Sequence, residues 1–536
     1  MVWLQMCKGK SVFDGLPCAA LKSIVFSSLN WLKLLTLMEH EIELKLLLPE
    51  GIDDSELTTV LSQFSANIEI SEYTLFNQYF DTPDWLLSKQ KMGLRVRSSE
   101  RGIEQTVKTS GKSVAGLHQR PEYNVAIDSL EPNLALFDSS IWPEKVDIEE
   151  LQDSVIQVFH TDFKRKTFLM RLANDTDVEI AFDQGTISTA ESKDSISEIE
   201  LELKRGNVKI LFELAEKIAK VCPSQLGNLS KAARGYLLAK HQVAPKRRSL
   251  KAVDLTRGDS CEDAFVKGLE YSMKYWQEAE YRYMRTQKIS DLVDVYTGMN
   301  LLSECLRLFS DVIHADELLD VKNALSIRLR KWAWVEQLES IKALSSKRGM
   351  FSKKLAQHDA LFNYLRGLKD GTLNLSRPQF LITEKDNTIL QIKLSKMLTD
   401  KPWRNEKGRF QKDIRAFAEK KLENQWYNLI DKLSEISFSE SDYMAMYRRL
   451  KTALNYNVLL GQCFSASRRE EFTAPWKDIF LGIKELKTLN VLQNKLQGTD
   501  VEDKSELLSW SEVKKNNLLT VIEQSRAFAS NVENFW

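Results

Sequence analysis

The sequence predicts an α+β protein in which a β-barrel with a charged interior is followed by an all-helical region. Two acidic stretches, residues 41–45 and 197–204, alternate strictly between charged and apolar residues. A period of two is that of an extended strand, so the charged side chains lie on one face and the apolar ones on the other. After residue 248 this alternation stops, and long patterns of helical spacing follow with few Gly and Pro.

Short basic segments between the two acidic stretches repeat the alternation, at residues 94–97, 106–108, 120–122 and 163–165. For either acidic stretch alone, a half-exposed strand with its charges in water is an equally good interpretation. If all these strands close into a barrel with the charged faces inward, the lumen needs a neutralising partner. A polyanion with a divalent metal ion fits, because clustered carboxylates suit magnesium or manganese while Arg and Lys hold phosphates.

Eight motifs then follow one another in a fixed order along residues 38–240. They are Glu-x-Glu-x-Lys from Glu41, Tyr-Phe-Asp-Thr-Pro-Asp from Tyr79, the pair Arg95 and Arg97, Lys108, the pair Arg120 and Glu122, Asp183-Gln184-Gly185, the stretch from Glu198 to Lys204, and Ser-Lys-x-x-Arg-Gly-Tyr from Ser230. Together they resemble the CYTH domain of the triphosphate tunnel metalloenzymes. The resemblance implies an eight-stranded antiparallel tunnel that binds a triphosphate and cleaves or transfers a phosphoryl or nucleotidyl group.

On this basis the charged residues receive expected roles around Mg²⁺ or Mn²⁺. Glu43, Glu200 and Glu202 are expected to bind the principal metal ion, with Glu41 and Glu198 near a second ion or orienting water. Glu122 and Asp183 are expected to support the site. Glu41 is also expected to act in catalysis, together with Lys45, Lys108 and Arg165. The expected phosphate-holding cations are Lys45, Arg95, Arg97, Lys108, Arg120, Arg165, Lys231 and Arg234.

Turn and capping residues predict the remaining elements of this half. Residues 183–185 are expected at a strand end, and Lys231 and Arg234 one turn apart on a helix, both pointing at the tunnel mouth. The other expected elements are a helix over 55–65 that plugs or flanks the barrel, a strand over 77–80, hairpins of 104–108 with 118–125 and of 160–172 with 177–184, and a helix over 208–222 outside the barrel.

The second half resembles the CHAD domain in position and helix rhythm, which implies helical bundles. It departs from that family's basic motif, because the helix over 294–309 keeps only Arg307 and the helix over 441–460 has Arg448, Arg449 and Lys451 without His. The resemblance therefore carries the fold better than polyphosphate binding. The expected helices cover residues 264–286, 292–313, 315–339, 351–367, 410–433, 441–463 and 474–495.

The expected domains are an N-terminal extension over 1–37, the tunnel domain over 38–241, a linker over 242–258 and the helical domain over 259–536. The apolar run 19–37 is too polar and too short to span a bilayer. Residues 1–37 are interpreted as a non-native or disordered start-site extension, with a short amphipathic anchor as the alternative. Met38 stands where the family usually begins.

The chain carries 75 Lys plus Arg and 75 Asp plus Glu, so local clustering rather than net charge must attract an anion. Six Cys without a Cys-x-x-Cys pair indicate reduced thiols and a cytoplasmic protein. Nucleic acid and membrane are not expected as partners.

The leading hypothesis is metal-dependent hydrolysis of inorganic triphosphate to pyrophosphate and phosphate. The helical half favours it, because the whole chain resembles the CYTH-CHAD arrangement of bacterial inorganic triphosphatases. The alternatives are a thiamine triphosphatase, an adenylyl cyclase of the CYTH type, and a non-catalytic polyphosphate-binding protein. Polyphosphate is also a candidate partner of the helical domain.

Overall fold

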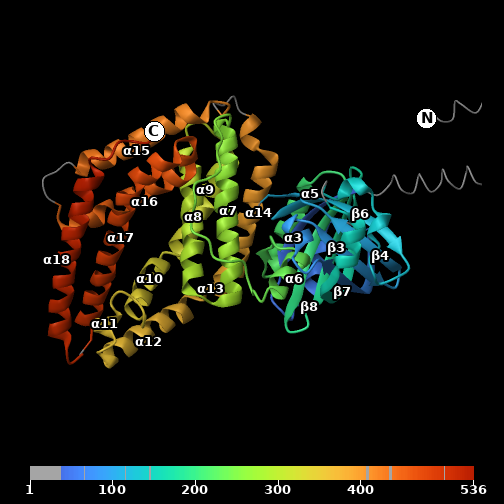
Figure 1. Cartoon of the computed structure of the whole chain (residues 1–536), viewed down its shortest axis with the longest axis horizontal. Coiled ribbons are helices and arrows are strands. Elements are labelled where there is room, and N and C mark those ends of the chain that lie inside the picture. Colours follow the sequence, from blue (N-terminus) through green and yellow to red (C-terminus); the bar gives the residue numbers. More distant parts are fainter. Residues whose placement is uncertain are drawn as a thin grey trace, which may run out of the picture.

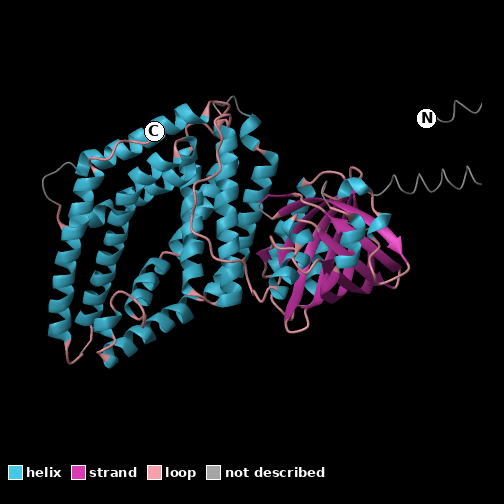
Figure 2. Cartoon of the chain, in the orientation of Figure 1, coloured by secondary structure: helices cyan, strands magenta, loops and turns pink. Residues whose placement is uncertain are grey.

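The computed structural model describes residues 38–52, 54–64, 67–114, 116–143, 146–405, 410–433, 438–499 and 501–536. The extension expected over 1–37 lies outside these ranges. Figure 1 shows a barrel on one side of the protein and a helical region on the other, and Figure 2 shows that the strands are confined to the barrel. No helix in the described ranges is long and apolar enough to cross a membrane.

The barrel is closed by eight antiparallel strands, as the sequence predicts. Their order is β1-β9-β8-β7-β2-β3-β4-β6, and β6 pairs back onto β1. Two short strands, β5 (Lys112–Val114) and β10 (Gln225–Leu226), extend the sheet at β6 and β1. The eight strands are β1 (Met38–Leu47), β2 (Ile68–Asp81), β3 (Gly93–Ser99), β4 (Gly102–Lys108), β6 (Leu117–Ile127), β7 (Ile156–Leu172), β8 (Thr176–Ser188) and β9 (Lys193–Arg205).

The strand register turns the charged faces into the barrel. Glu43 lies opposite Glu202, and Lys45 lies opposite Glu200. The intervening Leu44 points the other way and is fully buried in a cluster beneath helices α2 (Ser55–Ser62) and α5 (Lys209–Val221). Alternation therefore supplies both a charged lumen and an apolar outer face. The other helices of this half are α3 (Leu86–Lys89), α4 (Ile148–Ser154) and α6 (Lys231–Ala239).

Two local expectations in this half are wrong. Residues 183–185 lie inside β8, which continues to Ser188, and β2 begins nine residues before the predicted Asn77. The close approach of the neighbouring strand favours glycine at position 185, because a Cβ there would lie 2.2 Å from the carbonyl oxygen of Asp162. A glycine that normally signals a turn marks instead a close approach of two strands.

The helical half contains more helices than the sequence pattern indicates. The single helix expected over 315–339 is wrong, because the chain breaks at Trp332 and Ala333, where the fully buried Trp332 indole anchors the turn. The single helix expected over 351–367 is also wrong, because the structure has separate helices over 352–355 and 359–376. The helices over 378–383, 385–400 and 504–529 were not predicted. The helices are α7 (Cys261–Thr286), α8 (Ile289–Leu308), α9 (Asp316–Lys331), α10 (Trp334–Leu344), α11 (Ser352–Leu355), α12 (Asp359–Ser376), α13 (Pro378–Thr383), α14 (Lys385–Asp400), α15 (Ile414–Leu433), α16 (Glu440–Leu460), α17 (Ala466–Gln497) and α18 (Lys504–Ala529).

The two halves share a packed interface. Ile392 of α14 is fully buried in the apolar cluster of the barrel's outer face, and α14 lies against α5. The backbone N–H of Ser224 donates to the carbonyl of Thr383 at 3.2 Å. The segment expected as a linker, 242–258, packs onto the helical half, because Val253 is buried there and its N–H donates to the Val458 carbonyl at 2.8 Å.

We expect Ile392→Ala to destabilise the protein by about 2 to 5 kcal/mol, because it removes buried methyl groups and leaves a cavity between the halves. Chemical unfolding followed by intrinsic fluorescence measures the loss. Lys393→Ala is the matched control, because Lys393 is the exposed neighbour on the same helix. Equal stability of the two variants would contradict an apolar contact between the halves.

Candidate active site

The barrel encloses a cavity of about 540 Å³ whose walls are mainly charged. This size suits a small ligand. Of the residues predicted to form the site, the cavity is lined by Glu41, Glu43, Lys45, Arg95, Arg97, Lys108, Arg120, Glu122, Arg165, Glu200, Glu202 and Lys231.

The carboxylates of one wall are only partly compensated by nearby cations. Burial raises the pKa of Glu43 to about 7 despite the nearby Lys45, and the charges of Glu200 and Glu41 add to the rise. In the described ranges, Glu43 forms no ion pair or hydrogen bond. Burial also raises the pKa of Glu202, although its carboxylate lies 2.7 Å from the Lys204 ammonium. This wall therefore has room for added positive charge.

A second group of carboxylates is already neutralised by lysine. Oxygens of Asp183, Glu198 and Glu200 lie within 4.8 Å of one another, a spacing that a metal ion could occupy. The Lys231 ammonium lies 2.6, 2.5 and 3.0 Å from these three side chains. Lys45 adds contacts of 3.1 Å to Glu198 and 2.7 Å to Glu200. Lysine thus holds the place that a metal ion would need in this cluster.

Glu198, expected near a metal ion, belongs to this lysine-bound group. It is fully buried and does not line the cavity with Glu43 and Glu202. Asp183 is also fully buried, and it orients Arg165, whose Nε and Nη2 donate to it at 2.7 and 2.6 Å. Asp183 thus fixes the orientation of the Arg165 guanidinium, and its expected supporting role in the site stays a prediction.

Glu200 links the acidic wall to three cations. Its carboxylate accepts from Arg165 Nη2 at 2.6 Å, in addition to the contacts with Lys45 and Lys231. Burial alone would raise its pKa, but Lys231, Lys45 and Arg165 hold the pKa of Glu200 well below its ordinary value. The residue stays ionised next to the more easily protonated Glu43.

The opposite wall consists of paired cations from β3 and β4. Lys108 Nζ lies 2.7 Å from Glu41 and 3.1 Å from Glu122, and Arg95 Nη2 lies 3.2 Å from Glu122. Burial alone would raise the pKa of Glu122, but Lys108 and Arg95 lower it to about 2. Glu122 thus supports two of the expected phosphate-holding cations.

The sequence did not predict a role for Asn77. Its Oδ1 accepts from Arg97 Nε at 2.8 Å, and its amide donates to Thr161 at 2.9 Å. Burial and the neighbouring Arg95 and Arg165 lower the pKa of Arg97 to about 10, although its Nη1 lies 3.6 Å from a Glu104 oxygen. The amide of Asn77 thus orients this guanidinium together with Glu104. Asn77 could have been found from its place two residues before Tyr79, on the same face of the strand.

The expectation that Lys231 and Arg234 point together at the tunnel mouth is wrong. Lys231 lines the cavity, but Arg234 is buried outside it and donates to Asp194 at 2.6 and 3.0 Å. Both side chains contact Glu198, but Arg234 extends toward Asp194 near the start of β9, whereas Lys231 extends toward Glu200 and the cavity. Arg120 does line the cavity, and in the described ranges its guanidinium has no hydrogen-bond or ion-pair partner.

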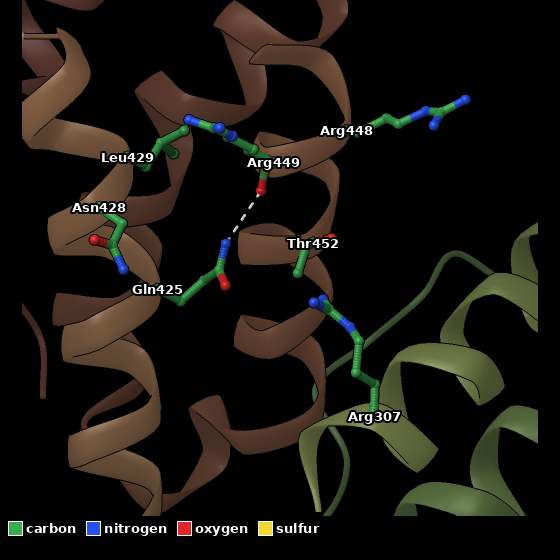
Figure 3. Close-up of a pocket in the computed structure, with 7 residues that line it drawn as sticks. All are labelled: Arg307, Gln425, Asn428, Leu429, Arg448, Arg449 and Thr452. Carbon is green, nitrogen blue, oxygen red and sulfur yellow. Dashed lines mark hydrogen bonds between the residues drawn. The ribbon is translucent and has the colours of Figure 1, made fainter. Parts of the chain in front are cut away.

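The helical half has a basic pocket of its own, of about 420 Å³, between α8, α15 and α16. It brings Arg307 together with Arg448 and Arg449, the cations that the sequence shows on two separate helices. Figure 3 shows Arg307 pointing toward Thr452 while Arg448 points away from it. Lys451 instead lies 3.5 Å from Glu336, outside this pocket.

Comparison with known proteins agrees with the barrel. Residues 39–236 match the CYTH domain, so the resemblance is confirmed for this region. The chain is 41% identical over 207 residues to an inorganic triphosphatase from Haemophilus influenzae. That alignment covers 38% of this chain and 57% of the relative, so the chain matches little more than half of the relative's length.

Two solved structures are similar to separate parts of the chain. One is a putative adenylyl cyclase from Hippeastrum described as having a dominant triphosphatase activity, at 21% identity and a TM-score of 0.27, covering 38% of this chain and 98% of that protein. The other is the CHAD domain from the plant Ricinus communis, at 13% identity and a TM-score of 0.41, covering 55% of this chain and 99% of that domain.

The opposite pKa shifts of Glu43 and Glu122 predict opposite pH dependence of stability without metal. Glutamate titrates near 4.5 in the unfolded chain. The stability of the wild type relative to Glu43→Gln should fall as pH rises from 4.5 to about 7, because the folded protein keeps the Glu43 proton to a higher pH than the unfolded chain does. Relative to Glu122→Gln, it should fall as pH drops from 4.5 toward 2. Urea unfolding in chelator measures both differences, and pH-independent differences would contradict the two assignments.

Proposed function

We propose that the tunnel hydrolyses inorganic triphosphate to pyrophosphate and phosphate with Mg²⁺ or Mn²⁺. The observation that carries this proposal is a cavity in which the carboxylates of β1 and β9 face cations from β3, β4, β7 and α6. The similarity to the inorganic triphosphatase from Haemophilus influenzae supports it. We assign the tunnel domain to residues 38–241 and the helical domain to residues 259–536, in a cytoplasmic protein.

The residues present fit a divalent cation. Glu43 and Glu202 lie opposite each other on the paired strands β1 and β9. Both have raised pKa values, which an added cation would lower by stabilising the ionised carboxylates. We therefore assign these two carboxylates to the principal ion, with Glu200 and Glu41 beside them. Oxygen donors of this kind suit magnesium or manganese. When bound, such an ion neutralises charge on the phosphates and acts as a Lewis acid.

The cations of the tunnel hold and orient the triphosphate. Lys45, Arg165 and Lys231 share Glu200, so a phosphate oxygen can take the place of one of these contacts without leaving a buried charge unpaired. Phosphoryl transfer needs mainly positioning and charge stabilisation, which fixed cations in a partly desolvated cavity provide. Arg95, Arg97, Lys108 and Arg120 extend this surface along the opposite wall.

Glu41 is the carboxylate we assign to orienting the attacking water. Its ion pair with Lys108 holds it on the cavity wall, and its neighbour Glu43 lies on the same face of β1. An ionised carboxylate held at a fixed position can accept a proton from water during attack.

Polyphosphate at the helical domain is a second proposal, supported by a different observation. The lining of this pocket includes Arg307, Arg448 and Arg449 and, in the part of the chain that the structure describes, no carboxylate, although Arg307 Nε donates to Glu304 at 3.0 Å.

The alternatives for the tunnel itself are a thiamine triphosphatase and a CYTH-type cyclase. Both would bind the triphosphate of their substrate in the same way, and they differ in the organic group attached to that triphosphate.

The full-length protein should release phosphate from inorganic triphosphate faster than from ATP or thiamine triphosphate, and the activity should vanish with EDTA. Glu43→Gln should weaken the affinity for the metal ion, so that excess Mg²⁺ or Mn²⁺ restores part of the lost activity, because one oxygen ligand is missing. A phosphate-release assay across metal concentrations checks both results. Full activity in chelator would overturn the metal assignment.

Lys108→Ala should lower kcat/KM for inorganic triphosphate by on the order of a hundredfold, with the metal concentration for half-maximal activity unchanged. Metal cannot replace a cation that contacts phosphate, so excess metal should not rescue this variant. Lys89→Ala is the control, because Lys89 forms an exposed pair with Asp84 outside the cavity. A variant that regains activity with metal would place Lys108 among the groups that organise the ion instead.

A further inference from the structure

One carboxylate of the barrel is held by arginines from both halves of the chain. Asp194, near the start of β9, accepts from Arg234 of α6 and from Arg285 of α7. The helix α7 is the first helix of the helical half, and Figure 1 shows α6 on the side of the barrel that faces this half. Asp194 therefore forms an ion pair across the interface between the tunnel and the helical half.

A series of buried ion pairs leads from Asp194 into the tunnel. Arg234 Nη1 lies 3.4 Å from Glu198 Oε2, and the other oxygen of Glu198 lies 2.5 Å from the Lys231 ammonium. Arg234 and Glu198 are almost inaccessible to solvent, so water does not screen these contacts. Lys231 is the last residue in this series of ion pairs, and it lines the cavity.

Arg285 is held in place from its own side as well. Its guanidinium lies over the Tyr281 ring of α7, with the centroid 5.2 Å away. Burial alone would raise the pKa of Asp194, but the charges of Arg234 and Arg285 lower it below its ordinary value. Asp194 is thus ionised between two oriented guanidinium groups.

The helix α6 is short, with nine residues. Helices of this length are not stable by themselves, so contacts with the rest of the protein set their position. Losing Arg285 would leave Asp194 with one cation instead of two, and Arg234 and the turn of α6 that carries Lys231 would be less tightly held. A misplacement of about 1 Å in a group that contacts substrate is costly for catalysis.

We propose that Arg285 is a positioning residue of the tunnel: through Asp194, Arg234 and Glu198 it sets where the Lys231 ammonium lies. The helical half then contributes to turnover by completing the tunnel, beyond any ligand of its own. This inference rests on the proposed function, in which Lys231 holds a phosphate.

The test compares Arg285→Ala, Arg285→Lys and Arg330→Ala in the full-length protein. Arg330 is the matched control, because it is an exposed arginine of α9 bonded to Ser326 and remote from the tunnel cavity. Arg285→Ala should lower kcat/KM for inorganic triphosphate about ten- to a hundredfold, as outer-sphere partners do. Arg285→Lys should recover part of the loss, because lysine keeps the charge but not the fork. Equal rates of Arg285→Ala and Arg330→Ala would overturn the proposal.

A second arm asks whether Arg285 acts through Lys231. In a Lys231→Ala background, Arg285→Ala should change kcat/KM by no more than about twofold, because the ammonium that Arg285 would position is already absent. Fully additive losses would show that Arg285 acts elsewhere and would overturn the proposal.

Hydrogen exchange of residues 231–239 gives a readout independent of activity. Arg285→Ala should speed exchange there while Arg330→Ala leaves it unchanged, and unchanged exchange in Arg285→Ala would also overturn the proposal. If the wild type releases no phosphate from triphosphate, the proposed function fails, and the exchange result still decides whether Arg285 positions α6.

Discussion

The tunnel depends on one carboxylate that three cations share. Glu200 accepts from Lys45, Lys231 and Arg165, each from a different element of the barrel. A buried charge without partners would be prohibitive, whereas a network in which each member is paired can be held in a partly dry lumen. This network keeps three cations close together without a ligand, ready for the oxygens of a polyanion.

The lumen is not neutral throughout, and the imbalance divides it into two regions. Lysine and arginine saturate the carboxylates around Asp183, Glu198 and Glu200, but Glu43 keeps a pKa of about 7 because burial and like charges oppose its ionisation. A cation from solution binds most favourably next to the carboxylates that protein cations neutralise least. We therefore propose Glu43 and Glu202 as metal ligands and the lysine-rich cluster as part of the phosphate site.

The helical half is joined to the barrel by contacts of two kinds. Ile392 supplies an apolar contact, which stabilises the pair of domains without regard to orientation. The bridge from Arg285 to Asp194 is directional, because a guanidinium must approach a carboxylate in a limited geometry. Together they give the interface both strength and a fixed orientation next to α6.

The sequence by itself determined the barrel and most of its lining, because a period of two forces residues such as Glu41, Glu43 and Lys45 onto one face whatever the rest of the chain does. It also indicated an all-helical second half, although the break at Trp332 and the helix α14 depend on tertiary packing that local pattern does not contain. The partners were decided only by the tertiary structure. Three of these contacts join residues far apart in the chain: Glu198 with Lys231, Arg234 with Asp194, and Asn77 with Arg97. Strand spacing shows which face of the sheet a side chain takes. It does not show which residue that side chain contacts across the barrel.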